Sequence, residues 1–437
     1  MADAADPPTV AGALRWLTLA LIVSAVLFNG VLAAINGNVF PVSRTMVIIC
    51  ELGIFAGIAL VLAATRIHKS DWPAFALLFT MVIIALLISI GEDRLYPDQI
   101  RNYGIIALFT LLGSRCDEAL VRKAFAIVSV VVLLFLILEL ASLPTYTALF
   151  HPASYFEQTR GVEQRDFNDT GLFASTLGYA GRFSYGIFNA PRTSSIFVEQ
   201  VSLAGFATVL EVFLLGFWQR LSNPWRVLHT ALIILILLSN NARAASTLCV
   251  LGLIGYFAYP RLPRYFNLLL APLLLLGSLS FLDLFNAFYM RGDNLVGRLG
   301  VSWRALYSID FRTLLTGAID RSVHMLDAGY AYVIMSTTIF GLIAFWLYAS
   351  LIVPQTTAPK RRVAWGLALY LFSWLLIGGT AVFTIKTASL IWLLAGFMRR
   401  SNEPHSATDS EIAELSGRRA ANIRLLRPAR THSVSAT

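Results

Sequence analysis

The chain has 437 residues, of which 57% are hydrophobic and only 14% are charged, and its net charge is +9. A soluble domain carries about a quarter charged residues, so this composition excludes an ordinary soluble protein and favours one that lies in a membrane. The basic residues separate apolar runs and do not line an aromatic-rich groove, so we expect no nucleic-acid partner.

Continuous apolar runs predict α-helices that cross a membrane, because a transmembrane β-strand would alternate apolar and polar residues instead. The expected fold class is all-α, a polytopic membrane helix bundle of about twelve spans. The expected spans are 14–35, 45–64, 73–90, 103–113, 124–143, 194–217, 227–239, 244–259, 265–285, 328–349, 363–383 and 385–398.

These spans divide the chain into six parts. An N-terminal bundle of five spans (1–143) precedes a first long loop (144–193) and the core spans (194–285). A second long loop (286–327), the C-terminal spans (328–398) and a basic tail (399–437) follow. Lys and Arg are more frequent in the short loops on the side of the N-terminus, which predicts that both termini are cytoplasmic and both long loops periplasmic.

Both long loops are rich in arginine and contain no lysine, and they are expected to be partly folded. Arg160 and Arg192 belong to the first loop, and Arg298 and Arg304 belong to the second. A guanidinium binds phosphate through two parallel hydrogen bonds and stays charged when partly desolvated, so these arginines suit a pyrophosphate at the membrane surface. The alternative is that they are solvated charges paired with aspartates of the same loops.

Two polar stretches border the core spans on the loop side. Arg243 follows a tight turn of asparagines (240–241) and begins the next helix, where a charge so close to hydrocarbon indicates either function or an interfacial anchor. In the stretch 189–199, Ser194 or Ser195 is a candidate helix cap and Glu199 lies one to two turns into the span. With Arg243 or a loop arginine as partner, and with a raised pKa, Glu199 is a candidate general base.

The stretch 320–330 leads from the second long loop into the next span. His324 and Asp327 lie in it, and both residue types serve as general bases near neutral pH, although a lone loop histidine is as often merely solvated. The sequence contains no nucleotide-binding or metal-ligand motif and only three cysteines without paired spacing, so we expect no cofactor and no metal.

Four features of the sequence resemble the O-antigen polymerase and ligase superfamily, the Wzy-type integral membrane glycosyltransferases. They are the two long loops after the fifth and ninth spans, the Arg-then-Glu stretch 189–199, the Ser-x-x-Arg-small-small run 239–245, and the order of residues from Gly317 to Gly341. Ligases carry a His-Asn-like pair where this chain has Asp327-Ala328-Gly329-Tyr330, which favours a polymerase.

The resemblance implies a polymerase of the bacterial inner membrane that joins oligosaccharide repeat units carried on undecaprenyl pyrophosphate into O-antigen or exopolysaccharide. A chain-length regulator and an export machinery are possible partners. Two alternatives stay open, a ligase that transfers the glycan to another acceptor and a flippase or transporter of lipid-linked sugar. The residues assigned to the site are Glu199, His324 and Asp327 for proton transfer, and Arg160, Arg192, Arg243, Arg298 and Arg304 for the pyrophosphate.

Overall fold

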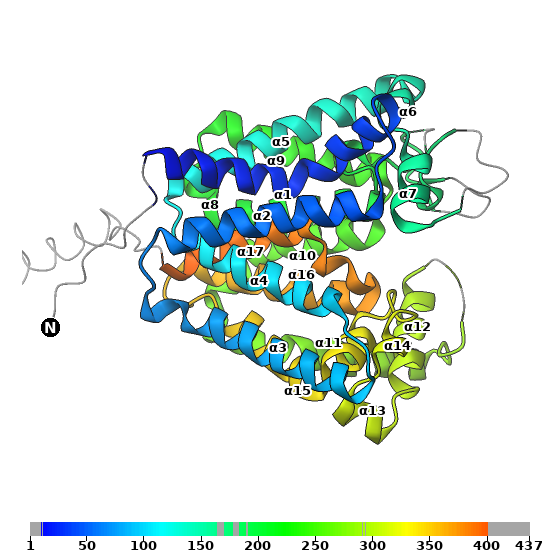
Figure 1. Cartoon of the computed structure of the whole chain (residues 1–437). Helices are drawn as coiled ribbons and strands as arrows, with labels where there is room; N and C mark the ends of the chain where they lie inside the picture. The colour runs from blue at the N-terminus through cyan, green and yellow to red at the C-terminus, as the bar shows by residue number, and fades with distance from the viewer. Residues whose placement is uncertain are drawn as a thin grey trace, which may run out of the picture. The chain divides into compact units, whose positions relative to one another are not determined.

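The computed structural model describes residues 10, 12–163, 170–177, 183–188, 191–290, 292 and 294–400. All regular structure in these residues is helical, as Figure 1 shows, so the predicted all-α fold class is confirmed. The predicted tail beyond Arg400 and the first two residues of the stretch 189–199 lie outside the described residues.

The described chain contains long α-helices and, between them, shorter ones. The long helices are α1 (Gly12–Asn38), α2 (Arg44–Ala63), α3 (Trp72–Gly91), α4 (Pro97–Gly113), α5 (Glu118–Ala141), α8 (Gln200–Phe217), α9 (Asn223–Asn240), α10 (Arg243–Ala258), α11 (Leu270–Leu284), α15 (Gly329–Leu351), α16 (Ala358–Ile377) and α17 (Ile385–Arg400). Between them lie five shorter α-helices, α6 (Leu143–Phe150), α7 (Pro152–Arg160), α12 (Leu295–Tyr307), α13 (Phe311–Thr316) and α14 (Ile319–Ser322).

Seven stretches are long and apolar enough to cross a membrane, which supports the prediction of a membrane protein. They contain α1, α2, α3, α5, α8, α11 and α15. The other long helices are shorter or carry more polar residues, and α16 and α17 lie almost wholly within the bundle. A helix that is shielded by other helices does not depend on an apolar surface to lie in hydrocarbon.

The two ends of the bundle differ. One end, which we call the loop face, carries the short helices α6, α7 and α12–α14 (Figure 1). The opposite end, the terminal face, carries the start of α1 and the end of α17, where Val10 N–H donates to the Arg115 carbonyl and Arg399 donates to the Ser70 carbonyl. The described parts of both long loops thus contain short helices at this end, and their periplasmic placement stays a prediction.

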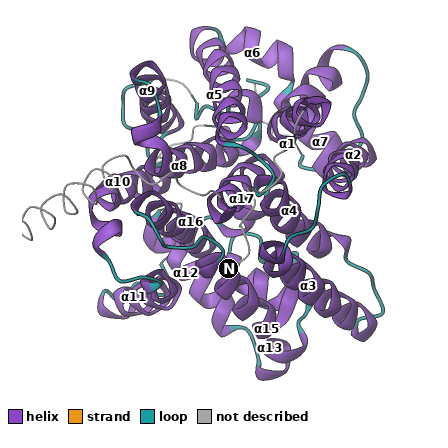
Figure 2. Cartoon of the chain, turned by 90° about the vertical axis from the view of Figure 1, so that its left-hand side faces the viewer, coloured by secondary structure: helices purple, strands orange, loops and turns teal. Residues whose placement is uncertain are grey.

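Helix α17 lies at the centre of the bundle. It packs against α4, α8, α1, α5 and α16, and every residue from Ile385 to Met398 is buried (Figure 2). Glycines make its closest contact possible, because a Cβ at Gly396 would lie 1.9 Å from the Thr110 carbonyl and one at Gly113 would lie 2.0 Å from the Leu393 carbonyl. Small residues at such crossings let two helix backbones approach each other.

The structure corrects several predicted boundaries. Helix α4 begins at Pro97, whereas the sequence predicted a span from 103, because proline is well suited to the first turn of a helix. Helix α8 begins at Gln200, whereas the span was predicted from 194. Helix α16 ends at Ile377 and is followed by the short 3₁₀ helix η7 (Gly379–Phe383), whereas the span was predicted to continue to 383.

Candidate functional site

The stretch before α8 is not helical except for the 3₁₀ turn η3 (Ser195–Phe197), although its side chains are buried. Ser195 and Val198 have positive φ angles of 49° and 54°. A β-branched residue rarely adopts this left-handed conformation, which costs about 1–2 kcal/mol and persists only where neighbouring contacts enforce it.

Glu139 of α5 supplies those contacts. Its carboxylate accepts hydrogen bonds from the backbone N–H groups of Ser194 (2.9 Å) and Ser195 (2.7 Å), and the Tyr146 hydroxyl donates to the Ser195 carbonyl (2.7 Å). The prediction that one of these serines caps α8 is therefore wrong. The N-cap position belongs to Glu199, and the serine amides bind a buried carboxylate from another helix.

The two core motifs of the sequence contact each other. The side-chain amide of Asn240, at the end of α9, donates to the carbonyls of Thr193 (2.5 Å) and Gln200 (3.0 Å). Asn241 then adopts a left-handed conformation with φ 53°, which ends α9 and lets α10 begin directly at Arg243, as predicted. Hydrogen bonds from Asn240 thus hold the stretch that contains Arg192 and Glu199 against the turn that precedes Arg243.

Glu199 lies between two cations. Its carboxylate accepts from Arg160 Nη1 at 2.9 Å and from Lys386 Nζ at 3.3 Å, and the Ser202 hydroxyl donates to it at 2.8 Å. The Lys386 side chain is only 2% exposed and also donates to the Phe197 carbonyl at 3.0 Å, whereas the Arg160 side chain is 42% exposed. Arg160 is therefore the loop arginine that pairs with Glu199, one of the two kinds of partner predicted for it.

The charge state of Glu199 differs from the one that a general base needs. The residue precedes the span that begins at Gln200. Burial by itself would raise the pKa of Glu199, but the charges of Arg160 and Lys386 hold this pKa well below its ordinary value. A carboxylate with such a low pKa has little affinity for a proton, so the raised pKa on which the prediction of a base depended is absent.

A second ion pair lies close to the first. Arg101 of α4 binds Glu51 of α2 through two hydrogen bonds of 2.5 and 2.6 Å. Glu51 lies close enough to Lys386 for their charges to attract, and Arg101 lies close enough to Arg160 for their charges to repel. We call Glu51, Arg101, Arg160, Glu199 and Lys386 the loop-face charge cluster; three cations face two carboxylates, and five elements contribute to it.

The other arginines predicted for the site on the first long loop and the core motif are Arg192 and Arg243, and Arg243 begins α10. The Arg243 guanidinium stacks over the Phe183 ring at 4.7 Å from its centre, and its side chain is exposed. Tyr185 binds the same turn, since its N–H donates to the Asn241 side chain at 2.8 Å. Arg192 is half-buried, and its N–H donates to the Thr176 carbonyl at 3.1 Å.

The residues predicted on the second long loop lie apart from these contacts. Arg298 of α12 donates to the Ile377 carbonyl at 3.3 Å, and Arg304 donates to the Phe288 carbonyl. His324 and Asp327 are exposed, and neither side chain forms a hydrogen bond or ion pair within the described residues. The loop nevertheless reaches the hairpin between α16 and α17, because Thr380 N–H donates to the Leu326 carbonyl at 2.9 Å.

The sequence reasoning did not assign Glu51, Arg101 or Lys386 to the site. Glu51 stands alone within an apolar run, and Arg101 and Lys386 stand near the ends of apolar runs, where a basic residue is equally well explained as an orientation signal. The one available signal was their depth, since an ionisable residue beside hydrocarbon needs a partner. Within the described ranges, no group of His, Cys, Asp and Glu side chains has the arrangement of a metal site.

Comparisons with known proteins give no further guidance. No protein-family model matches the chain, and no curated protein or solved structure was found to match it.

Proposed function

We propose that the chain is a polysaccharide polymerase of the bacterial inner membrane, which joins repeat units carried on undecaprenyl pyrophosphate at the periplasmic side. The observation that carries the proposal is the loop-face charge cluster, in which Glu199 holds the half-exposed Arg160 beside the first long loop. A guanidinium that is held by an ion pair at the end of apolar helices suits a lipid-linked anion.

In this proposal Arg160 is the central ligand of the pyrophosphate. Glu199 and the Phe156 ring, 4.5 Å from the guanidinium, fix its position, while 42% of its side chain stays accessible. The proposal assigns further ligand roles to Arg192 and Arg243 on the core motifs, whereas Arg298 and Arg304 of the second long loop lie apart from them and donate to backbone carbonyls. Charges that are fixed before the reaction stabilise a leaving group without reorganisation, and the loss of one such group costs about 10²–10³ in rate.

The proposed reaction is a displacement at an anomeric carbon. A sugar hydroxyl of one repeat unit forms a new bond to the anomeric carbon of another glycan, the bond from that carbon to the pyrophosphate oxygen breaks, and the lipid pyrophosphate leaves with the electron pair. His324 or Asp327 takes the hydroxyl proton, since both are exposed and unpaired in the described structure. Glu199 keeps Arg160 and Lys386 in place and does not take the proton. The scheme uses no cofactor.

A purified reaction tests the proposal. The full-length chain in nanodiscs is given a lipid-linked repeat unit, and glycan length is read by gel electrophoresis. We expect polymer from the wild type, a loss of about 10²–10³ in rate for Arg160→Gln, and no loss for Arg261→Gln, which changes an exposed arginine of the terminal face. An Arg160→Gln variant that is folded and polymerises at the wild-type rate would contradict the assignment.

A further inference from the structure

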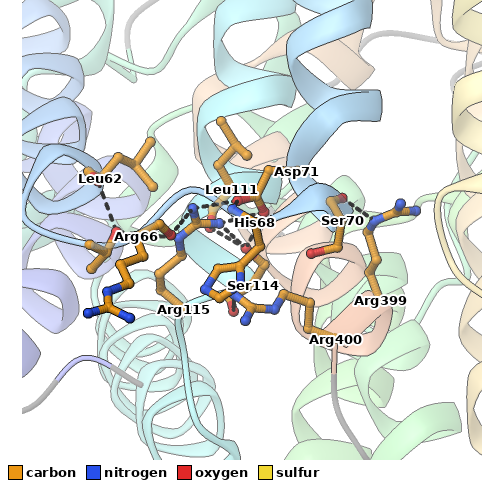
Figure 3. A network of polar contacts seen from close by, with 11 residues as sticks. Leu62, Arg66, His68, Ser70, Asp71, Leu111, Ser114, Arg115, Arg399 and Arg400 are labelled. Atoms are coloured by element: carbon orange, nitrogen blue, oxygen red, sulfur yellow. Dashed lines mark hydrogen bonds and ion pairs between the residues drawn. The ribbon is translucent and has the colours of Figure 1, made fainter. Parts of the chain in front are cut away.

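Arginines gather at the terminal face, far along the bundle from the loop-face charge cluster. Figure 3 shows Arg66 and His68 from the connection between α2 and α3, Arg115 from the end of α4, and Arg399 and Arg400 from the end of α17. We call Arg66, Arg115, Arg399, Arg400 and Asp71 the terminal-face arginine cluster. It contains four arginines and one aspartate, an excess of three positive charges.

The aspartate is fully engaged by one arginine. Arg115 donates from both terminal nitrogens to Asp71 at 2.7 and 2.6 Å, and the two side chains are only 2% and 1% exposed. The second oxygen of Asp71 also accepts the His68 N–H at 2.8 Å. The carboxylate is therefore neutralised by Arg115 and leaves the other three arginines without a described counter-ion in the cluster.

Those three arginines donate to neutral groups only, or to none. Arg399 donates to the Ser70 carbonyl at 2.7 Å and to the Ile352 carbonyl at 3.1 Å, and Arg400 donates to the Ser114 carbonyl at 3.2 Å. The Arg66 side chain is exposed and forms no hydrogen bond or ion pair with the described residues. A guanidinium has five N–H donors, so each retains donors for a further acceptor.

Neighbouring groups on this face do not balance the charge. Asp117 pairs with Arg15 at 3.0 Å, and Glu118 pairs with Arg220 at 3.0 Å. The His68 Nε2 atom is buried and has no hydrogen-bond partner in the described structure. Burial lowers the pKa of His68, and the charge of Arg400 lowers it further.

Apolar side chains border the arginines. Ile67 and Trp72 flank the connection and are 68% and 66% exposed, and Leu60, one turn before the end of α2, is 62% exposed. Tryptophan is enriched where the hydrocarbon of a membrane meets its headgroups, so the exposed Trp72 and Ile67 make this connection suited to the headgroup region. A free anion would gain nothing from the apolar side chains, whereas a lipid uses both them and the arginines.

We propose that the terminal-face arginine cluster binds the phosphate of an anionic phospholipid, with Arg66 and Arg400, which lie on the same side of Arg399 in Figure 3, as its ligands. The acyl chains then lie along the exposed side of α2 and α3. Because α17 ends in one of these arginines and begins beside Lys386, the lipid holds the inner end of the central helix in place. The site is independent of the polymerase proposal.

Lipid binding tests this proposal directly. Native mass spectrometry and thermal melting are measured on the full-length chain in phosphatidylcholine nanodiscs with and without phosphatidylglycerol. We expect phosphatidylglycerol adducts and a higher melting temperature for the wild type. Each arginine removed weakens phosphatidylglycerol binding by about fivefold, since one basic residue near an anionic surface contributes about 1 kcal/mol.

Matched variants separate this site from general surface charge. Arg66→Gln is the cleanest change, because this exposed side chain forms no hydrogen bond or ion pair with the described residues, and Arg66→Gln with Arg400→Gln should remove the phosphatidylglycerol effect. The control is Arg261→Gln with Arg264→Gln, which removes two exposed charges from the connection after α10. The proposal is overturned if the cluster variants retain the lipid effect, if the control loses it equally, or if inorganic phosphate alone reproduces it.

Discussion

Removing Glu199 and removing Lys386 should have unequal effects on stability, although the two residues form one ion pair. Two unit charges 3.3 Å apart attract by about 5 kcal/mol at an effective dielectric constant near 20. Glu199→Gln leaves the buried Lys386 ammonium with only a carbonyl partner, and breaking a buried pair in this way costs about 3–5 kcal/mol. Lys386→Met leaves Glu199 still bound to Arg160 and Ser202, so only about 1.5–3 kcal/mol is lost.

Thermal unfolding in detergent, followed by intrinsic fluorescence, tests this order. We expect the lowest melting temperature for Glu199→Gln, an intermediate one for Lys386→Met, and a partial recovery in the double variant, where neither charge is stranded. Asp320→Asn is the control, since its pair with Arg94 is 69% and 66% exposed and contributes less than about 1 kcal/mol. The reasoning is refuted if Lys386→Met is the more damaging change, or if Glu199→Gln melts like the wild type.

Three further predictions concern other parts of the bundle. The low pKa of Glu199 stabilises the fold at pH values above the unfolded-state pKa of about 4.3. Acid should therefore lower the melting temperature of the wild type more steeply than that of Glu199→Gln as the pH falls below about 4. Equal losses of melting temperature in the two proteins between pH 7 and pH 3 would contradict this. Arg115→Gln strands the buried Asp71 and should cost about 3–5 kcal/mol, read as a lower melting temperature, whereas an unchanged temperature would mean that Asp71 is protonated. Gly396→Ala should lower the melting temperature through a cost of about 1–3 kcal/mol, because its Cβ meets a backbone carbonyl, whereas Gly53→Ala faces open space and should have no such effect.

The sequence predicted the helical class well, because apolar runs of span length have few alternative structures, whereas the twelve spans and the periplasmic placement of the loops stay predictions. It misplaced the start of α8 for a physical reason. Ile196, Phe197 and Val198 form an apolar triplet that is separated from the apolar part of α8 only by Glu199 and Gln200, so the predicted span was drawn through them although they lie in a strained, non-helical segment. The group that holds this segment, Glu139, lies 55 residues earlier in the chain. No local sequence pattern can indicate a contact between residues so far apart in the chain.

The candidate site shows the same limit. Arg160 and Glu199 were both assigned from their own surroundings, and the structure joins them. Lys386 and Arg101 were not assigned to the site, because nothing near either residue in the sequence indicates its partner. The pairing of Lys386 with Glu199 spans 187 residues and follows only from the packing of α17 in the centre of the bundle.

The profile of lipid-linked glycans in cells that carry Arg243→Ala tests the polymerase proposal most directly. The side chain is exposed and stacks on a loop residue, so its removal should leave the protein folded, and immunoblotting of membranes verifies its level. The account predicts that single lipid-linked repeat units accumulate on the periplasmic side while long polymer disappears. Normal polymer that stays on its carrier would indicate a ligase, repeat units that fail to cross the membrane would indicate a flippase, and an unchanged profile with the protein present would contradict the role of Arg243.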